Sequence, residues 1–193
     1  MEYALMRFLH ILGAILIGAG LIGVFMADMR SRQLRDLKAF AESVRTVAVS
    51  YDGLVVPGAI LLLGSGAWAI VRFHGGWQFL QVPWLAGMVI LFALEFIEGN
   101  TITRLYFMRL RRLTEKALEQ GRSSEELQKA RDESLPTFTH FLDLPIFFLI
   151  VALGAIRPND WTLFAVGSAI AITLAGALSI AIPRLYPWRG AMI

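Results

Sequence analysis

The chain lacks cysteine and has little charge. Without cysteine among its 193 residues, it cannot form disulfide bridges, thiolate metal sites or cysteine nucleophiles. Charged residues make up only 17% of the chain, against about 25% in an average soluble domain. Hydrophobic residues make up 56%, and the mean hydropathy is +0.61. This composition is typical of a membrane protein and excludes a soluble enzyme or a nucleic-acid-binding protein.

The chain contains several long apolar segments. A helix needs about 20 apolar residues to cross a bilayer, and five segments meet this requirement. The sequence therefore predicts an all-α fold, a polytopic membrane helical bundle that forms a single membrane domain over residues 1–193. A cleaved signal peptide is not expected, because the chain begins without a basic region and its first apolar run has full span length. The predicted spans are 3–26, 54–73, 83–103, 137–156 and 161–182.

Lysine and arginine are distributed unevenly between the connections. All but Arg7, Arg72 and Arg157 of the 18 basic residues lie in the first connection, the third connection or the C-terminal tail with Arg184 and Arg189. Positively charged connections stay in the cytoplasm. The sequence therefore predicts an N-terminus outside, a cytoplasmic C-terminus, and a multi-pass protein of the bacterial inner (plasma) membrane. The distribution of basic residues therefore indicates how the protein is oriented in the lipid bilayer. It does not indicate binding to nucleic acid.

The third connection, residues 104–135, is predicted to form a cytoplasmic helical hairpin. Residues 104–120 continue the third span with strong helix formers, and Gly121 is a typical C-cap. Ser123 and Glu126 have the spacing of a capping box that opens a second helix. The hairpin is interpreted as a solvated connector or, alternatively, as a docking surface for a cytoplasmic or membrane protein partner. A homo-oligomer is also left open.

Two glutamates interrupt the third span. Glu95 lies near the bilayer midplane, and Glu98 lies about one turn closer to the cytoplasm at a rise of about 1.5 Å per residue. A charged carboxylate at the centre of a membrane helix costs at least about 2.5 to 3.5 kcal/mol. The pair is therefore predicted to be functional, with a neutral, hydrogen-bonded packing role as the alternative.

Further polar residues are expected at similar depths on other spans. Asp143 of the fourth span lies level with Glu98, and His140 lies nearer the cytoplasm on the same helix face. Glu98, His140 and Asp143 also resemble the ligand pattern of bundle metal sites. Asp28 and Asp52 are placed at the cytoplasmic ends of the first two spans, where a helix-end role is the simpler interpretation. The predicted proton-handling residues are Glu95, Glu98, Asp143, His140, Asp28 and Asp52.

A lone histidine lies in the first span, on the opposite side. His10 is about 6 Å outside the midplane by the same rise per residue. It is interpreted either as a packing residue hydrogen-bonded to a neighbouring helix or as a ligand of haem or a metal ion. Met6 shares its helix face, and thioether plus imidazole suits Cu(I). His74, in contrast, is expected in a surface turn.

Two other features of the apolar segments have structural interpretations. Gly18, Gly20 and Gly23 match the spacing of a dinucleotide fingerprint, but they lie inside a span with no preceding strand. They predict close helix packing instead. Aromatic residues at span boundaries, Tyr51 among them, are expected in the interfacial belt.

The run Phe8-Leu-His10-Ile-Leu-Gly13 resembles the opening helix of the CopD copper-resistance membrane domain and of the HemJ-type protoporphyrinogen oxidase family. The resemblance continues from Asp52 to Trp68. The chain is also similar to an uncharacterised bacterial integral-membrane family of this type. In the HemJ-type family the histidine that matches His10 is implicated in binding haem b, so the resemblance implies a redox role. That family's lysine in a later span has no counterpart here.

Three functions follow as hypotheses. The first is a small haem b- or metal-binding protein for electron transfer, with the acidic cluster handling the accompanying protons. The second is a transporter or channel for protons or metal cations that uses Glu95 and Glu98. The third is a non-catalytic accessory or assembly protein that holds a partner through the basic hairpin. Whether the protein is an enzyme is left open.

Overall fold

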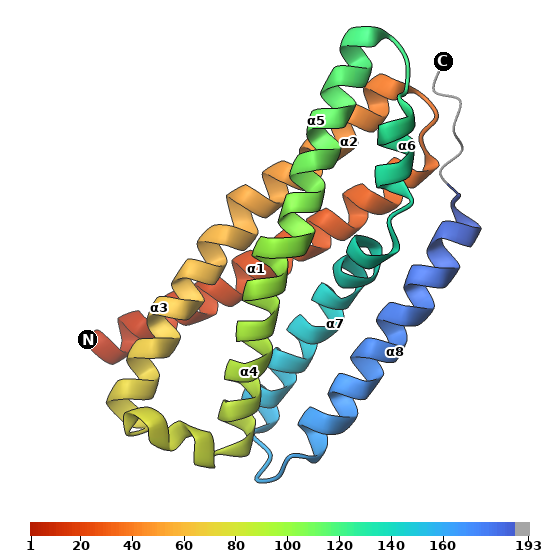
Figure 1. Cartoon of the computed structure of the whole chain (residues 1–193). Helices are drawn as coiled ribbons and strands as arrows, with labels where there is room; N and C mark the ends of the chain where they lie inside the picture. Colours follow the sequence, from red (N-terminus) through yellow and green to blue (C-terminus); the bar gives the residue numbers. More distant parts are fainter. Residues whose placement is uncertain (188–193) are drawn as a thin grey trace.

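The structure is a computed structural model of the chain that describes residues 1–187. Every regular element within this range is helical, and five helices are long and apolar enough to cross a membrane (Figure 1). The predicted all-α class with five membrane helices is confirmed, while Arg189 lies outside the described residues. The helices are α1 (Glu2–Gln33), α2 (Leu37–Ser50), η1 (Tyr51–Val55), α3 (Val56–Phe73), η2 (Gly76–Gln81), α4 (Pro83–Glu98), η3 (Gly99–Thr103), α5 (Arg104–Gln120), α6 (Glu125–Arg131), α7 (Ser134–Ile156) and α8 (Thr162–Leu185).

Two of the membrane helices continue well beyond their apolar segments. One helix runs from Leu37 to Phe73 through η1, and another runs from Pro83 to Gln120 through η3. The helix-end role of Asp52 is therefore wrong, because η1 lies inside a continuous helix. Asp28 also lies within α1 and not at its end. Hydropathy shows where apolar residues stop, but charged residues such as arginine and glutamate are good helix formers and extend the helix.

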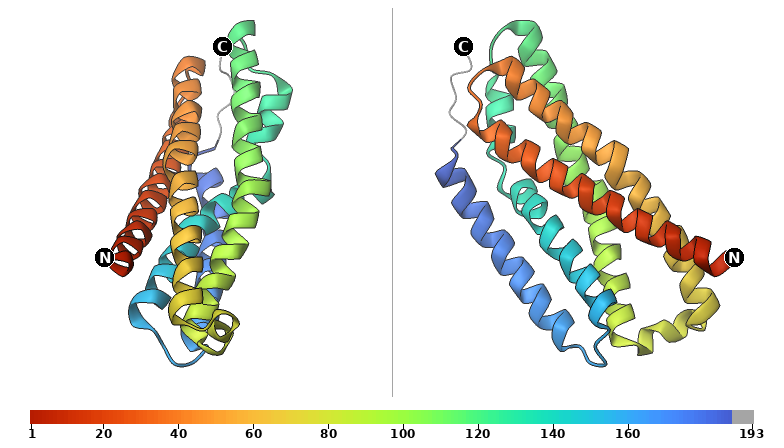
Figure 2. Two further views of the ribbon diagram at one scale, coloured as in Figure 1. Left: turned by 90° about the vertical axis from the view of Figure 1, so that its left-hand side faces the viewer. Right: turned by 180° about the vertical axis from the view of Figure 1, so that it is seen from behind.

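Glycines allow α1 to pack closely against η1 and α3. A Cβ atom added to Gly13 would lie 2.9 Å from the carbonyl oxygen of Gly58, and one added to Gly20 would lie 2.6 Å from Val55 Cγ2. The prediction that the glycines of the first span form a helix-packing surface is confirmed. On the other side of the bundle, α7 packs between α4 and α8 (Figure 2).

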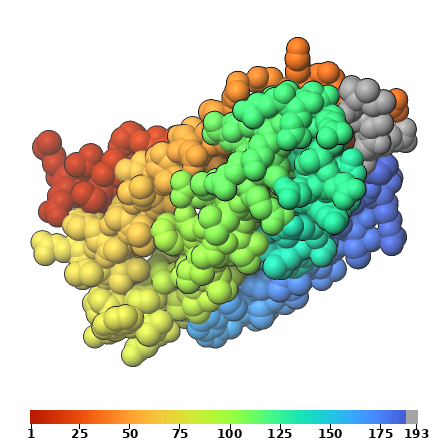
Figure 3. Space-filling model, turned by 45° about the horizontal axis from the view of Figure 1, so that its top comes forward, coloured from red at the N-terminus to blue at the C-terminus, as the bar shows by residue number. Residues whose placement is uncertain are grey.

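The hydrophobic core of the bundle extends into the basic end of the molecule. α2 packs against α1 and α5, and α6 packs against α5, so that their side chains cover this end in the space-filling view (Figure 3). Phe40 and Leu127 are fully buried there, and the Arg131 guanidinium lies 4.6 Å from the centre of the Phe40 ring. Burial lowers the pKa of Arg131 to about 10. The third connection is therefore packed against α2 and is not an isolated hairpin.

Local signals in the third connection agree with the structure except for one residue. Gly121 ends α5 with a φ of +66°, a left-handed conformation that favours glycine. The N-cap of α6 is Ser124, whose side chain accepts a hydrogen bond from the backbone N–H of Leu127 at 3.1 Å. The predicted box of Ser123 and Glu126 is thus wrong by one position, because adjacent serines offer two starts for the helix.

Candidate functional site

Three carboxyl groups meet in the interior between α4 and α7. Glu95 and Glu98 extend from the last turns of α4, and Asp143 extends from the middle of α7. One oxygen atom from each lies within 4.8 Å of the others. Like charges this close cannot all remain ionised away from water, so the group needs a shared proton or a bound cation. We call these three residues the carboxyl cluster.

Two oxygen atoms of the carboxyl cluster have no hydrogen-bond donor. Asp143 is 4% exposed, and neither its Oδ2 atom nor Glu98 Oε2 receives a hydrogen bond from the residues that the structure describes. Leaving a buried acceptor unsatisfied costs about 1 to 3 kcal/mol. Folded proteins contain few such atoms, which makes these oxygens candidate ligand atoms.

A chain of hydroxyl groups leads from the carboxyl cluster toward the basic end. Thr103 Oγ1 donates to Glu98 Oε1 at 2.6 Å and lies 3.0 Å from Thr139 Oγ1. Since Thr103 uses its single hydroxyl hydrogen for Glu98, it can only accept from Thr139. Thr139 Oγ1 also lies 3.3 Å from the carbonyl oxygen of Pro136, near the start of α7. Both threonines are buried, so the chain is shielded from lipid.

The carboxyl cluster lies beside two π-helical turns, η1 and η3. Such turns widen the helix and are frequent at functional sites. At η3 the side chains of Asn100 and Thr101 donate to the carbonyl oxygens of Phe96 and Ile97 at 2.7 and 2.6 Å. At η1 the turn places Tyr51 inside the bundle, where it is 7% exposed. The prediction that Tyr51 belongs to the interfacial belt is therefore wrong.

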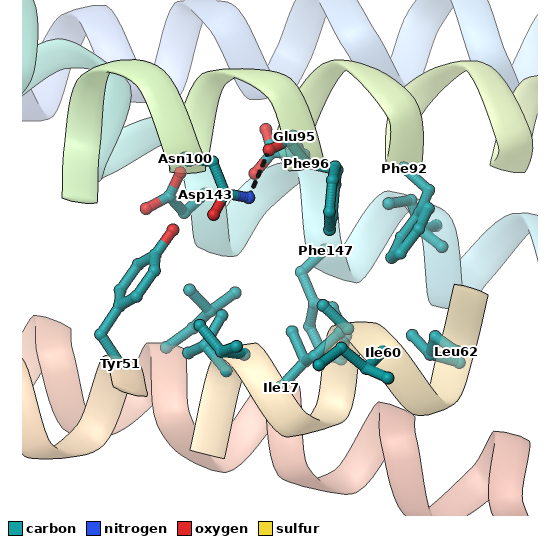
Figure 4. A pocket seen from close by; sticks show the side chains of 16 residues that line it. Ile17, Tyr51, Ile60, Leu62, Phe92, Glu95, Phe96, Asn100, Asp143 and Phe147 are labelled. Atoms are coloured by element: carbon teal, nitrogen blue, oxygen red, sulfur yellow. Dashed lines mark hydrogen bonds between the residues drawn. The ribbon is translucent and has the colours of Figure 1, made fainter. Parts of the chain in front are cut away.

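A cavity of about 200 Å³ adjoins the carboxyl cluster. Tyr51, Asn100 and Asp143 lie around its polar end (Figure 4), where the dashed line marks the bond from the Asn100 amide to Phe96. Phe92 and Phe147 lie around the opposite end. The cavity is therefore amphipathic, with hydrogen-bonding groups at one end and rings and aliphatic side chains at the other.

A second buried polar group lies between α1 and α7. Arg32 Nε donates to Asp28 Oδ2 at 2.8 Å, and His140 Nε2 lies 3.7 Å from the same oxygen. All three residues are at most 5% exposed. Neither ring nitrogen of His140 forms a hydrogen bond with the described part of the chain. His140 therefore lies next to Asp28 and is separate from the carboxyl cluster of Glu95, Glu98 and Asp143.

The six predicted proton-handling residues therefore form two groups and leave one residue apart. Asp52 pairs with Arg104 at 3.2 Å, and both side chains are more than one third exposed. His140 and Asp143 share a face of α7, but their side chains lie at different levels of the helix. As a result, each contacts a different neighbour.

His10 contacts the neighbouring helix through a hydrogen bond. Its Nδ1 atom lies 3.0 Å from Ser65 Oγ, and the Ser65 hydroxyl donates to the carbonyl oxygen of Leu61 at 2.5 Å. Nδ1 therefore carries the hydrogen, which leaves the lone pair on Nε2. This geometry agrees with the packing interpretation and leaves one ligand atom available, so haem or metal binding through His10 and Met6 stays a prediction.

His74 was predicted from the sequence, whereas three residues near the buried polar groups were not. His74 follows α3 and packs edge-on against Trp84 at 6.1 Å, in agreement with a turn residue. Arg32 was missed, although its spacing of four from Asp28 is a recognisable ion-pair signal. Thr103 and Thr139 carried no such signal, because they are far apart in sequence.

The fold and the site define an integral membrane protein of five membrane helices with a buried carboxyl cluster. The chain belongs to the DUF2269 family, described as a predicted integral membrane protein, whose sequence profile matches residues 4–158. No curated protein and no solved structure matches the chain. The family match covers α1 to α7, and thus the whole carboxyl cluster. It supports membership of a membrane family and does not extend to the CopD or HemJ-type families.

Proposed function

We propose that this protein moves protons across the membrane and that the carboxyl cluster is its proton-binding site. The observation that carries the proposal is the buried Asp143 Oδ2 atom, which has no donor among the described residues and lies beside Glu95 and Glu98. Intramembrane carboxyl groups of this kind are typical of proton relays. A proton is the smallest cation that removes the repulsion within the cluster.

The hydroxyl chain supports a route from this site. Thr103 and Thr139 connect Glu98 to the start of α7 through contacts of 2.6 and 3.0 Å. Hydroxyl groups both accept and donate hydrogen bonds, so they can pass a proton along a chain. The route ends toward the basic end of the bundle.

Proton flux into proteoliposomes tests the proposal. A potassium diffusion potential set with valinomycin drives the flux, and an internal pH dye reports it. We expect flux from the wild type that falls to the level of empty liposomes in Glu95→Gln/Glu98→Gln. Glu42→Gln, a substitution at an exposed residue of α2, is the matched control. Wild-type flux no greater than that of empty liposomes, or equal flux in the double variant, would contradict the proposal.

A divalent cation is the second candidate, favoured by the spacing of the three carboxylate oxygens. All-oxygen ligand sets suit hard cations such as Mn²⁺ and Mg²⁺. The same vesicles loaded with a metal-sensitive dye separate the two cations. Mn²⁺ entry that requires Glu95 and Asp143, without proton flux, would assign the site to metal transport.

Haem b at His10 remains a separate proposal for electron transfer. It is supported by the hydrogen bond to Ser65, which leaves Nε2 as the ligand atom, and by the resemblance of the first span to the HemJ-type and CopD families. Bound haem would supply one-electron chemistry. The carboxyl cluster would then take up or release the accompanying protons.

We also propose an orientation in the membrane, a cellular location and a surface for a partner. The positive-inside rule supports an inner-membrane protein of a bacterium with α2, α5 and α6 in the cytoplasm. The packed basic end then offers a surface for a cytoplasmic or membrane protein partner. α8 contacts mainly α7, which leaves its other faces to lipid or to a second copy in a homo-oligomer.

A further inference from the structure

We propose that the cavity beside the carboxyl cluster binds a lipid-soluble molecule with one ring that carries hydroxyl or carbonyl groups, the chemistry of a quinol or quinone. The inference rests on the proposed function, because it assigns a proton-exchanging ligand to the same site. The size of the cavity, its polar lining and its position beside exposed apolar side chains support such a ligand.

The size of the cavity selects a single ring. Its volume is about 200 Å³, whereas an engineered cavity of about 150 Å³ in another protein binds benzene. Drug-sized ligands need about 300 to 1,000 Å³. One substituted ring therefore fits, while a macrocycle does not.

Two buried polar side chains, Tyr51 and Asp143, line the cavity. Both residues are at least nine-tenths buried. Asp143 Oδ2 receives no hydrogen bond from a donor within the described part of the chain, and its polar neighbours are the carboxyl groups of Glu95 and Glu98. Figure 4 shows Tyr51 and Asp143 at the same end. The Tyr51 hydroxyl can donate to a ligand carbonyl, and Asp143 can accept from a ligand hydroxyl.

The remainder of the lining suits the apolar part of such a ligand. Phe92, Phe96 and Phe147 surround the cavity away from the polar end, and aromatic rings pack favourably edge-on or offset against another ring. Ile60 and Phe96 line the cavity but are also 63% and 40% exposed on the lipid side. The backbones of α3 and α4 do not pack closely against each other. An apolar tail can therefore leave the cavity between these helices and enter the bilayer.

The test uses nanodiscs that contain the full chain, with protein-free nanodiscs to correct for partition into lipid. Decylhydroquinone and decylbenzoquinone are the probes, and decylbenzene is the matched compound without polar groups. We expect saturable binding of the two polar probes and none of decylbenzene. Equal binding of all three, or no saturable binding, would overturn the inference.

Substitutions in and outside the cavity test whether the probe binds there. Ala59→Phe fills the cavity and is expected to abolish binding, while Ala67→Phe adds the same ring to an exposed position of α3 and should leave it unchanged. Tyr51→Phe removes only the hydroxyl and is expected to weaken binding of decylbenzoquinone by about fivefold, the effect of one hydrogen bond. Unchanged affinity in both Ala59→Phe and Tyr51→Phe would exclude this cavity. Circular dichroism and size-exclusion chromatography confirm that each variant is folded.

The two proposals fail in different ways. Saturable probe binding without proton flux would contradict the proton-moving function and retain the ligand site. Proton flux that depends on Glu95 and Glu98, without probe binding, would retain the function and overturn the ligand.

Discussion

The hydroxyl group of Tyr51 lies directly against the backbone of Gly99, so that a Cβ atom added to residue 99 would be 2.5 Å from Tyr51 Oη. The two residues begin the two π-helical turns, η1 and η3. Their contact joins the α2–α3 helix to the α4–α5 helix beside the carboxyl cluster. Only a residue without a side chain permits this approach.

Gly99→Ala is therefore expected to destabilise the protein by about 1 to 3 kcal/mol, the usual effect of overpacking. Thermal unfolding in detergent micelles measures it. Gly53→Ala is the control within the other π-helical turn, because a Cβ atom there would meet nothing within 4 Å. Adding Tyr51→Phe to Gly99→Ala should restore most of the stability. Equal effects of the two alanine substitutions would refute the contact.

Asp28 pairs with the buried charge of Arg32. Asp28→Ala would remove the buried carboxylate that accepts from Arg32 Nε and lies 3.7 Å from His140 Nε2. Breaking a buried pair in this way costs about 3 to 5 kcal/mol, so we expect a large drop in stability in the same unfolding assay. Glu42→Ala removes the exposed partner of Arg45 and should change stability by at most about 1 kcal/mol. Similar effects of both variants would show that the Asp28 pair contributes little.

Thr103→Val tests the hydroxyl chain. Valine has nearly the shape of threonine but cannot donate to Glu98 or accept from Thr139, so proton flux in proteoliposomes should fall while the fold is retained. The neighbouring Thr101 donates to its own helix and is exposed, which makes Thr101→Val the control. Undiminished flux in Thr103→Val would exclude this route.

Haem binding at His10 is tested by the reduced-minus-oxidised spectrum of the purified protein. We expect a Soret band and an α-band that are lost in His10→Phe and retained in His74→Phe. Ser65→Ala removes the hydrogen bond that orients the ring, and it should weaken haem retention. Absence of both bands in the wild type, even after haem supplementation, would end this proposal.

Membrane orientation is directly accessible because the chain contains no cysteine. Each introduced cysteine is then the only site for a membrane-impermeant maleimide. In intact spheroplasts we expect labelling of Gln78→Cys, in η2, and none of Glu119→Cys, near the end of α5, until the membrane is opened. The opposite pattern would reverse the proposed orientation.

Local sequence signals predicted the features that depend on neighbouring residues. Gly121 ends α5, and the glycines around Gly20 form a packing surface, because each effect needs only backbone freedom or a missing side chain. Helix continuity was mispredicted at Asp52, since polarity and helix formation are separate properties. Tyr51 was assigned to the interface because sequence shows its depth but not the direction of its side chain.

The sequence by itself determined the membrane class, the five apolar helices, and the presence of carboxyl groups at a depth where they are costly. Helical periodicity also placed Glu95 and Glu98 on one face. Only the tertiary structure decided what that face meets: Asp143 and the threonine chain on one side, the cavity with Tyr51 on another, and His140 turned to Asp28 instead. The reason is physical, because the rotation of one helix against the next depends on side-chain packing between segments far apart in the chain.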